Sequence, residues 1–300
     1  MHLGRWLLPL LVACTHTQEP YERPDATPDG PLRPPVTDLV PAVGSDATLE
    51  IMTWNIENFP ANPFGTPATV ADLIASLDVD IVVTQEIASE TAWAELTARL
   101  ADTYDAVLST HQYSPTEYQK IGVIYRRGLV TAGEPTLMFP DDGYAFPRPP
   151  LLLPVTVDGE TLQLVGVHLK CCGEPGDAER RQAAIQALET RFRGQVDNGG
   201  EDQIVLLGDY NQNLDEVGST VLAPLLDAPE RYTIRTAPAA AAGEHSYLGF
   251  NSFIDHITTT AGLDALWGAA TVQVIDPRPQ VPGYKNEVSD HLPVVLIVPR

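Results

Sequence analysis

The chain ends in "VSDHLPVVLIVPR" (residues 288–300), in which an apolar run follows a polar cluster. Residues 292–298 have the length and the β-branched content of a buried strand. Asp290 and His291 stand at the entrance of this strand, where such a pair can bind a metal ion or transfer a proton. Whether they do so depends on which other residues converge at the same strand end.

From residue 49 onward, short apolar runs alternate with helical patterns. Helices are predicted at 66–77, with Thr66 as the cap, and at 91–101 and 177–192. Strands are predicted at 49–55, 80–86, 120–127, 203–211, 252–260 and 270–275, with a hairpin that turns at Asp158 and Gly159. The many strands and interspersed helices indicate an α/β domain in which two sheets pack face to face with helices outside.

Composition restricts the function. The 300 residues are 44% hydrophobic, which excludes wholesale disorder, and 40 acidic residues against 18 basic ones give a net charge of -22. A chain this acidic is unsuited to general, tight binding of a polyanion, because such binding requires a broad basic face. A polyanionic substrate held through a metal ion remains compatible with this charge.

The N-terminus has the layout of a secretory signal. One basic residue, Arg5, precedes a short apolar run that is too short to span a membrane, so residues 1–13 are predicted to be a signal peptide. "LVAC" (11–14) resembles the lipobox of bacterial lipoproteins, although an ordinary signal peptide can also end near a cysteine. The resemblance implies that Cys14 is lipidated and that the protein is exported to the bacterial cell envelope. Thr15, rather than Asp, then favours the outer membrane of a Gram-negative cell.

Residues 14–48 are rich in proline, with scattered Asp and Thr. This composition is typical of an extended, semi-rigid spacer without a core. We therefore expect a tether between a lipid anchor and a domain that spans residues 49–300.

Two of the cysteines, Cys171 and Cys172, are adjacent in "HLKCCGEPG". After secretion they can form a disulfide between neighbouring residues, or they can remain two thiols. A metal site is disfavoured, because no second Cys/His cluster offers further ligands.

Most of the predicted strands end in polar residues that can carry chemistry. Each such residue has an ordinary explanation, such as a turn, a solvated strand end or a core histidine. Together they predict an active site at the ends of core strands, where a rigid sheet directs side chains into one crevice. The residues are Asn55, Glu86, His168, Asp209, Asn211, Asp255, Asp290 and His291.

The residue types favour a particular chemistry. Carboxylate and amide oxygens without a Cys/His set favour Mg²⁺ or Mn²⁺ over zinc. Neither a G-x-S-x-G elbow nor a phosphate-binding G-x-x-x-x-G-K-[ST] loop occurs in the sequence, which indicates water as the nucleophile. Metal-activated water that attacks a phosphoester uses all of these groups.

Six motifs, "TWNIENF", "QE", "GVHLK", "GDYN", "SFIDHI" and "SDHLPV", in this order resemble the endonuclease/exonuclease/phosphatase superfamily from residue 49 to the C-terminus. The resemblance implies a four-layered α/β sandwich, with two mixed β-sheets packed face to face, helices outside and the active site at one end of the sheets.

The resemblance also implies roles for the polar residues. Asn55 and Glu86 match the metal-binding residues of the family, and Asp290 matches a residue that assists them in some members. Asp209 and Asn211 match residues that act on water and steady the phosphate. Asp255 and His291 match a hydrogen-bonded pair, and His168 matches a second histidine that faces the phosphate. Whether Asp209 or His291 takes the proton stays open at this stage.

Further residues are candidates for substrate binding. Lys170, Arg180 and Arg181 can reach a phosphate, although Arg on an exposed helix face is usually only solvated. Tyr247, with Phe250 and Phe253, can stack on a base or meet a lipid, and one of the three is expected in the core.

These observations predict a divalent-metal-dependent phosphoric ester hydrolase that cleaves phosphodiester bonds in a nuclease-like manner. A phosphatase or phosphodiesterase acting on a lipid or small-molecule phosphoester is the alternative. An inactive surface-binding module is disfavoured by the intact set of polar residues. The expected partners are the phosphoester substrate and, through the lipid anchor only, a membrane; nothing in the sequence indicates a protein partner.

Overall fold

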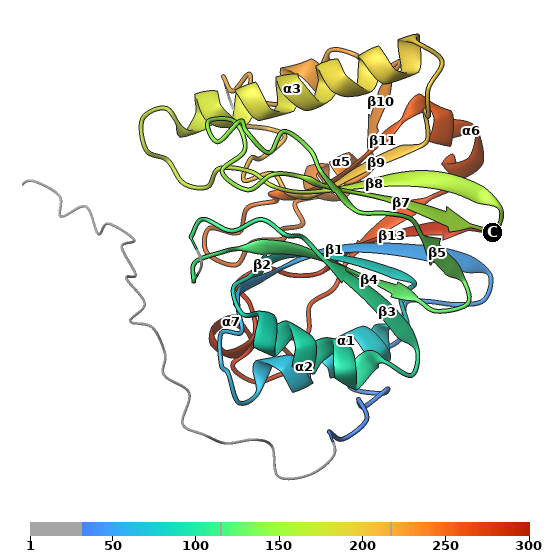
Figure 1. The fold of residues 1–300 in the computed structure, drawn as a ribbon, viewed down its shortest axis with the longest axis vertical. Helices are drawn as coiled ribbons and strands as arrows, with labels where there is room; N and C mark the ends of the chain where they lie inside the picture. Colours follow the sequence, from blue (N-terminus) through green and yellow to red (C-terminus); the bar gives the residue numbers. More distant parts are fainter. Residues whose placement is uncertain (1–31, 115, 217) are drawn as a thin grey trace, which may run out of the picture. The chain divides into compact units, whose positions relative to one another are not determined.

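Two mixed β-sheets occupy the centre of the structure (Figure 1). This computed structural model describes residues 32–114, 116–216 and 218–300, so the predicted signal peptide, Cys14 and most of the tether lie outside the described residues. The first sheet has the order β12-β13-β1-β2-β4-β3. Its strands are β12 (Thr271–Val274), β13 (Val294–Pro299), β1 (Thr48–Phe59), β2 (Ile81–Ile87), β4 (Lys120–Arg126) and β3 (Tyr104–Leu108).

The second sheet has the order β10-β11-β9-β8-β7-β5, and β6 pairs with β7. Its strands are β10 (Tyr232–Ile234), β11 (Asp255–Thr260), β9 (Ile204–Asp209), β8 (Glu160–His168), β7 (Leu151–Val157), β5 (Val130–Ala132) and β6 (Thr136–Leu137). β1 runs parallel to β2, and β8 runs parallel to β9, while the other pairs are antiparallel. Both sheets are therefore mixed, as predicted.

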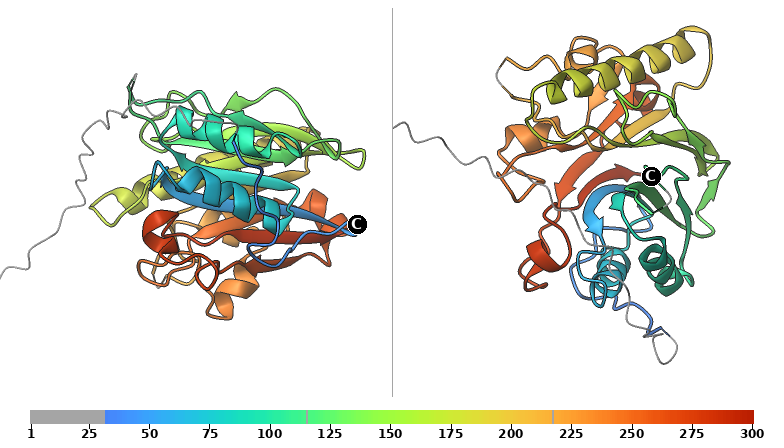
Figure 2. Two further views of the ribbon diagram at one scale, coloured as in Figure 1. Left: turned by 90° about the horizontal axis from the view of Figure 1, so that it is seen from below. Right: turned by 60° about the vertical axis from the view of Figure 1, so that its left-hand side comes forward.

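Helices cover the outer face of each sheet (Figure 2). α1 (Thr66–Leu77), α2 (Glu90–Leu100) and the short α7 (Tyr284–Glu287) pack on the first sheet, and α3 (Asp177–Asp197) packs on the second. The remaining helices are short: α4 (Ala223–Leu226), α5 (Ala237–Ala241), α6 (Asp264–Trp267) and the 3-10 turn η1 (Ala261–Leu263). This helix–sheet–sheet–helix order confirms the predicted four-layered sandwich.

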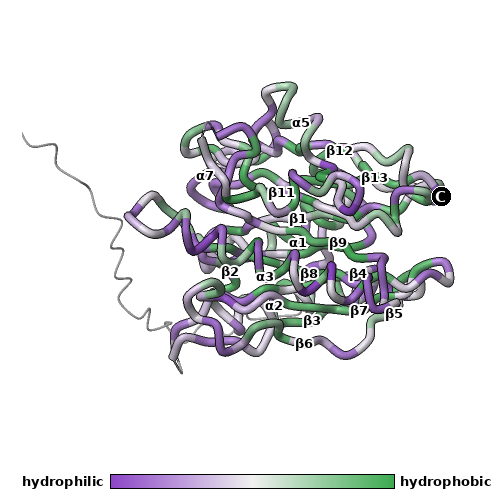
Figure 3. Tube along the Cα trace, turned by 90° about the horizontal axis from the view of Figure 1, so that it is seen from above, coloured by the Kyte–Doolittle hydropathy of each residue, from purple (hydrophilic) through white to green (hydrophobic). Residues whose placement is uncertain are grey.

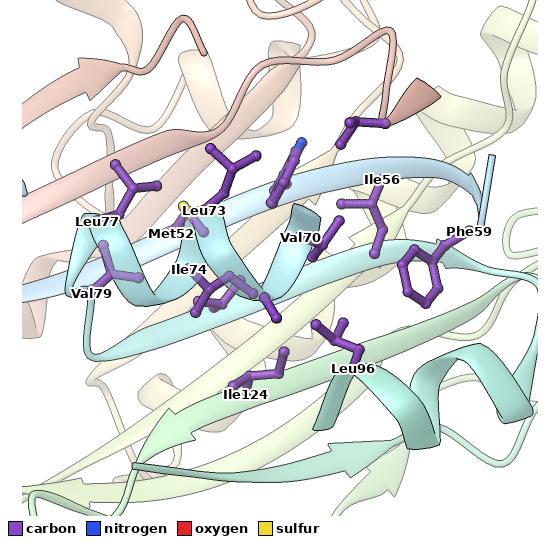
Figure 4. Close-up of a cluster of buried hydrophobic side chains, with 14 of the residues drawn as sticks. Met52, Ile56, Phe59, Val70, Leu73, Ile74, Leu77, Val79, Leu96 and Ile124 are labelled. Atoms are coloured by element: carbon purple, nitrogen blue, oxygen red, sulfur yellow. The ribbon is translucent and has the colours of Figure 1, made fainter. Parts of the chain in front are cut away.

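Strand periodicity separates the core into layers. Alternate residues of β1 face opposite ways, so Ile51 joins the core between the sheets while Met52 and Trp54 meet the helices. Figure 4 shows the helix-facing layer, in which Leu73 and Ile74 of α1 lie over β1 and β2. Hydrophobic residues follow the strands and polar residues gather mainly in the loops (Figure 3).

The segment before β1 packs against the domain, so the predicted tether extends too far toward β1. Arg33 forms an ion pair with Asp72 of α1 at 2.6 Å, the Leu39 N–H donates to Ser76 Oγ at 2.9 Å, and Val40 is buried. Residues 33–48 therefore belong to the compact unit of residues 33–300. The many prolines in this segment indicated a spacer without a core, yet it also contains apolar residues, Val40 among them, that pack against α1.

Most predicted elements are present with shifted ends, and the hairpin turns at Asp158 and Gly159 as predicted, since Val157 pairs with Glu160. The predicted helix cap at Thr66 is wrong, because Gly65 holds that position. The Thr66 hydroxyl instead donates to the Glu287 carbonyl at 2.6 Å and links α1 to the end of α7. Among the described residues, no helix is long and apolar enough to cross a membrane.

Candidate active site

Three neighbouring strands of the second sheet bring their polar residues into register. Asp209 of β9 pairs with Asp255 of β11 on one side and with His168 of β8 on the other. The inward-facing positions of β9 are Val205 and Leu207, which lie in the core between the sheets, and Asp209 continues that series. Asp209 therefore points between the two sheets at one end of the sandwich.

The first sheet contributes Asn55 and Glu86 to the same end. Asn55 continues the inward series of Ile51 and Thr53 on β1. The pairing of β2 is irregular after Thr84, and Glu86 has a φ of 64°. A bulge of this kind directs a side chain out of the regular alternation, and here it brings Glu86 Oε1 within 3.1 Å of Asn55 Nδ2.

Asp209 is the point where the two sheets meet. Its Oδ2 accepts hydrogen bonds from Asn55 Nδ2 at 3.1 Å and from Asn211 Nδ2 at 3.0 Å, and its Oδ1 accepts from the Asn211 N–H at 2.7 Å. His168 Nε2 lies 3.7 Å from Asp209 Oδ2 and 3.5 Å from Glu86 Oε1. Asn211 Nδ2 also donates to the Leu169 carbonyl at 3.2 Å. The loops after β8 and β9 are thus joined directly at the site.

Asp255 and His291 form the expected hydrogen-bonded pair. His291 Nδ1 lies 2.8 Å from Asp255 Oδ2, and Nε2 lies 4.0 Å from Asp209 Oδ2 and 3.7 Å from Asp290 Oδ1. Ser289 Oγ accepts from the His291 N–H at 2.9 Å and donates to the Asn55 carbonyl at 2.7 Å. The polar cluster before the last strand therefore fixes the imidazole at the meeting point of the sheets.

Crowding of acidic groups perturbs the protonation of this site. Burial, reinforced by the charge of Asp255, raises the pKa of Asp209 to about 7. Burial opposes the charged form of His291, but the charge and hydrogen bond of Asp255 outweigh it and raise its pKa to about 10. Burial and the nearby Arg148 hold the pKa of His168 well below its usual value, so this histidine is neutral.

The donor atoms suit a divalent cation. Burial and the Asp290 charge raise the pKa of Glu57 to about 7, and burial, with Glu86 adding to it, raises that of Asp290. Among the described residues, Asp255 Oδ1 is buried without a hydrogen-bond partner. A cluster of carboxylates that repel one another is the hard oxygen environment that binds Mg²⁺ or Mn²⁺.

Two separate sets of residues could hold the ion. Ligand atoms of Asp209, Asp255 and His291 all lie within 4.8 Å of one another and could bind a metal. Asp255 and His291, however, already hydrogen-bond to each other through Oδ2 and Nδ1. Glu86, Asn55 and Asp290 form the second set, in which Asn55 Nδ2 donates to Glu86 Oε1 at 3.1 Å and Asp290 is close enough to Glu86 for the two charges to interact.

Lys170 and Arg181, two of the three candidate cations, are engaged by protein groups. Lys170 Nζ donates to the Cys171 carbonyl at 2.9 Å and lies 3.2 Å from Asp177 Oδ1. Arg181 is buried and donates from Nη1 to the carbonyls of Lys170 and Cys172, both at 3.1 Å. The expectation that an arginine here is merely solvated is therefore wrong for Arg181, and its contact with substrate stays a prediction.

The three aromatic candidates differ in their surroundings, and one of them is buried in the core, as expected. The ring of Tyr247 lies 4.9 Å from that of His291 and 6.1 Å from that of Phe250, which is 85% exposed. Phe253 is buried in the core between the sheets, so one of the three is a core residue, as predicted. Tyr247 thus lies beside the site.

Several residues of the site escaped prediction. Gln119 Nε2 donates to Glu86 Oε2 at 3.2 Å, and Gln119 Oε1 accepts from Arg148 Nε at 3.0 Å. Neither residue belongs to a recognisable motif, so only the tertiary structure shows them. His256 is buried, with Nε2 2.9 Å from the Gln212 carbonyl and Nδ1 2.9 Å from Thr236 Oγ1. Its position in "SFIDHI" was a signal that could have identified it.

The model of the endonuclease/exonuclease/phosphatase family matches residues 52–291. No curated protein matches the chain significantly.

Solved structures share the fold at low identity. TDP2 from D. rerio, complexed with a single strand DNA product, is 16% identical with a TM-score of 0.63, and the match covers 84% of this chain and 99% of that one. The 3' phosphatase NExo from Neisseria, bound to a product DNA hairpin, is 18% identical with a TM-score of 0.63, covering 84% and 100%. An endonuclease/exonuclease/phosphatase from Bacteroides vulgatus is 18% identical with a TM-score of 0.62, covering 84% and 98%.

Proposed function

The chain belongs to the endonuclease/exonuclease/phosphatase family of phosphoester hydrolases, and we propose that it is a divalent-metal-dependent enzyme that cleaves phosphodiester bonds with water in a nuclease-like manner. The observation that carries this proposal is the meeting of Glu86, Asp209 and the Asp255–His291 pair at one end of the two sheets. Carboxylates, an oriented imidazole and two amides at this spacing are the groups that phosphoester hydrolysis by water requires.

His291 binds a phosphate oxygen in the proposed reaction. Asp255 holds Nδ1, so Nε2 faces Asp209 Oδ2 across 4.0 Å. A phosphate oxygen can accept a hydrogen bond from the imidazolium at Nε2, while Asp209 Oδ2, 4.0 Å away, serves the attacking water. The positive charge then stabilises the negative charge that builds up on the phosphate in the transition state.

Asp209 accepts the proton of the attacking water. An imidazolium with both nitrogens protonated cannot take another proton, and Asp209 is the carboxylate that faces it. Asn55 and Asn211 hold this carboxylate in place, and the neutral His168 beside it contacts the phosphate.

Glu86 and Asn55, assisted by Asp290, would hold the cation, for which Mg²⁺ or Mn²⁺ best fits hard oxygen donors. When bound, the ion would offset the charge of the phosphate and polarise the ester bond. Asn58 and Gln119 both donate to Glu86 Oε2, at 2.8 and 3.2 Å, and orient this carboxylate.

Nucleic acid is the leading substrate, because the TDP2 and NExo structures are described as bound to DNA products. The net charge of -22 favours a second candidate, a small-molecule or lipid phosphoester, since a surface this acidic repels a long polyanion.

A panel of substrates tests the proposal. The full chain would be assayed with Mg²⁺ or Mn²⁺ on DNA, RNA, a generic phosphodiester and a generic phosphomonoester, with Asp209→Asn as the control for contaminating enzymes. We expect turnover of diesters by the native chain and at least a ~10²-fold lower rate for the variant. Turnover of the monoester alone would refute phosphodiester cleavage, and equal rates for both proteins would refute the site.

A further inference from the structure

Cys171 and Cys172 place their sulfur atoms side by side. Both are free thiols, with Cys171 partly exposed and Cys172 exposed, and their Sγ atoms are 2.7 Å apart. Neighbouring side chains of an extended segment point in opposite directions. Cys172 instead has a φ of 81°, a conformation that L-residues other than Asn and Asp rarely adopt. This turn of the backbone brings the two sulfurs to the same side.

Hydrogen bonds to three successive carbonyls fix the turn. Arg181 Nη1 donates to the carbonyls of Lys170 and Cys172, and Lys170 Nζ donates to the Cys171 carbonyl. Arg181 is buried in α3, and Lys170 is paired with Asp177 at the start of that helix. The folded protein therefore fixes the backbone turn that brings the two sulfurs together.

We propose that Cys171 and Cys172 are a site of reversible oxidation, at which an oxidant of the disulfide class closes a bond between the two adjacent sulfurs. Cys171 Sγ accepts from Cys172 Sγ and lies 3.9 Å from the Lys170 ammonium, so it is the sulfur better placed to attack. This inference goes beyond phosphoester hydrolysis and does not depend on it.

The reaction is a balanced thiol–disulfide exchange. Cys171 attacks one sulfur of the oxidant, which forms a mixed disulfide and releases the first thiol. Cys172 then attacks the Cys171 sulfur of the mixed disulfide, which closes the protein disulfide and releases the second thiol. The two protein thiols lose two electrons to the oxidant, and their two protons leave on the released thiols.

The spacing of the residues favours reversibility. Adjacent Cα atoms are about 3.8 Å apart across a trans peptide bond, which is shorter than the span that most disulfides bridge. A bond closed over so short a span is strained and readily reduced. The pair therefore suits a switch rather than a permanent crosslink, and it lies in the segment whose Leu169 carbonyl contacts Asn211 in the candidate site.

Equilibration in glutathione buffers tests the proposal. The full chain would carry Cys14→Ser, which leaves only Cys171 and Cys172 of its three cysteines. Trypsin cleaves after Lys170 and Arg180, so both sulfurs lie in one peptide whose mass reports the bond. We expect a peptide lighter by two hydrogens, without a glutathione adduct. Because the fold holds the sulfurs together, the equilibrium constant should be at least ~10-fold larger for the folded chain than for the chain in denaturant.

Glutathione adducts alone, disulfide-linked dimers, or an equilibrium constant no larger in the folded chain would each overturn the proposal. The single variants test the assignment of the attacking sulfur in the same Cys14→Ser background. Cys172→Ser, which retains Cys171, should form its glutathione adduct faster than Cys171→Ser. The opposite order would overturn Cys171 as the attacking group.

Discussion

Asp255 determines which nitrogen of His291 faces the rest of the site, because its Oδ2 lies 2.8 Å from Nδ1 and leaves Nε2 toward Asp209. Asp255 is completely buried and paired across the sheet with Asp209, so in the proposed reaction it acts through His291. A carboxylate in this arrangement orients the imidazole and stabilises its protonated form.

Substitutions in this pair should be strongly non-additive. Asp209→Asn and His291→Ala should each lower kcat by at least ~10²-fold, because each removes a group that acts on the proton or the phosphate. Asp255→Asn should also lower kcat, and the double variant at 255 and 291 should cost little more than the worse single variant. Single-turnover rates on a generic phosphodiester provide the measurement. Losses that simply add would show that Asp255 and His291 act independently.

His256 should make the stability depend on pH. Burial lowers its pKa from 6.5 to about 4, so the fold favours the neutral ring. The neutral ring hydrogen-bonds to the Gln212 carbonyl and to the Thr236 hydroxyl. As the pH falls from 6.5 toward 4, the unfolded chain binds a proton that the folded chain does not, and stability is lost. The loss should reach about 2 kcal/mol by pH 5.

Urea unfolding at pH 7 and pH 5 measures this effect, with His256→Gln as the matched variant, since glutamine is uncharged at both values. The native chain should lose more stability than the variant over this interval. An equal loss in both proteins would contradict the assignment of a neutral, buried His256.

At the level of the strands, Gly208 permits the close pairing of β9 with β8. Its φ is 145°, and a Cβ atom at this position would lie 2.0 Å from the Val167 carbonyl oxygen. Because that contact is with backbone, a side chain can be accommodated only if the strands separate. Gly208 immediately precedes Asp209, so any such separation would also displace the proposed base.

Two glycine substitutions should have opposite effects. Gly208→Ala should lower the free energy of unfolding by ~2 kcal/mol or more and reduce kcat, since it strains the backbone beside Asp209. Gly194→Ala lies within α3, where a Cβ would meet nothing within 4 Å, and should raise stability by ~0.5–1 kcal/mol. Thermal unfolding of both variants compares them. A stable Gly208→Ala with full activity would refute the importance of this close approach.

The sequence predicted the elements whose pattern is local. The apolar runs ending in Asp209 and in Glu86 were readable, because buried strands are short and rich in β-branched residues. The half-exposed strand β3 was missed, since its YDAVL pattern lacks a buried run. The bulge at Glu86 could not be predicted, because a positive φ at glutamate comes from tertiary contacts rather than from local preference.

The contacts between distant segments were beyond the sequence. Motif order indicated that Asp255 and His291 would meet, yet nothing local indicated that Arg148 and Gln119 would support Glu86. In the same way, Arg181 is buried because the loop after β8 folds over it and offers the carbonyls of Lys170 and Cys172 to its guanidinium. A helical pattern in the sequence does not reveal such a contact.

For the whole molecule, the charge predicts weak dependence of DNA binding on salt. Removal of residues 1–13 removes Arg5 and changes the net charge from -22 to -23. A surface this acidic neutralises few phosphates and releases few counterions. We expect affinity for DNA to fall by about 10-fold or less between 50 and 200 mM salt at constant Mg²⁺. A steep decrease would reveal a basic groove that the charge does not suggest.

We propose that the full chain is anchored in the cell envelope through Cys14. When it is expressed in a bacterium, the chain should fractionate with membranes, and Cys14→Ser should release it or block its processing. Fractionation followed by mass spectrometry of the N-terminal peptide tests this expectation. Native protein recovered soluble with an unmodified Cys14 would rule out the anchor.

Removal and return of the metal tests the central claim most directly. Hydrolysis of a phosphodiester by the native chain should cease after exhaustive chelation and return with Mg²⁺ or Mn²⁺, because the proposed site binds the phosphate through a cation. Glu86→Gln should require a higher metal concentration for half-maximal rate while unfolding at nearly the native temperature, since Glu86 lies at the edge of the core. Undiminished hydrolysis by the chelated native chain would contradict the account.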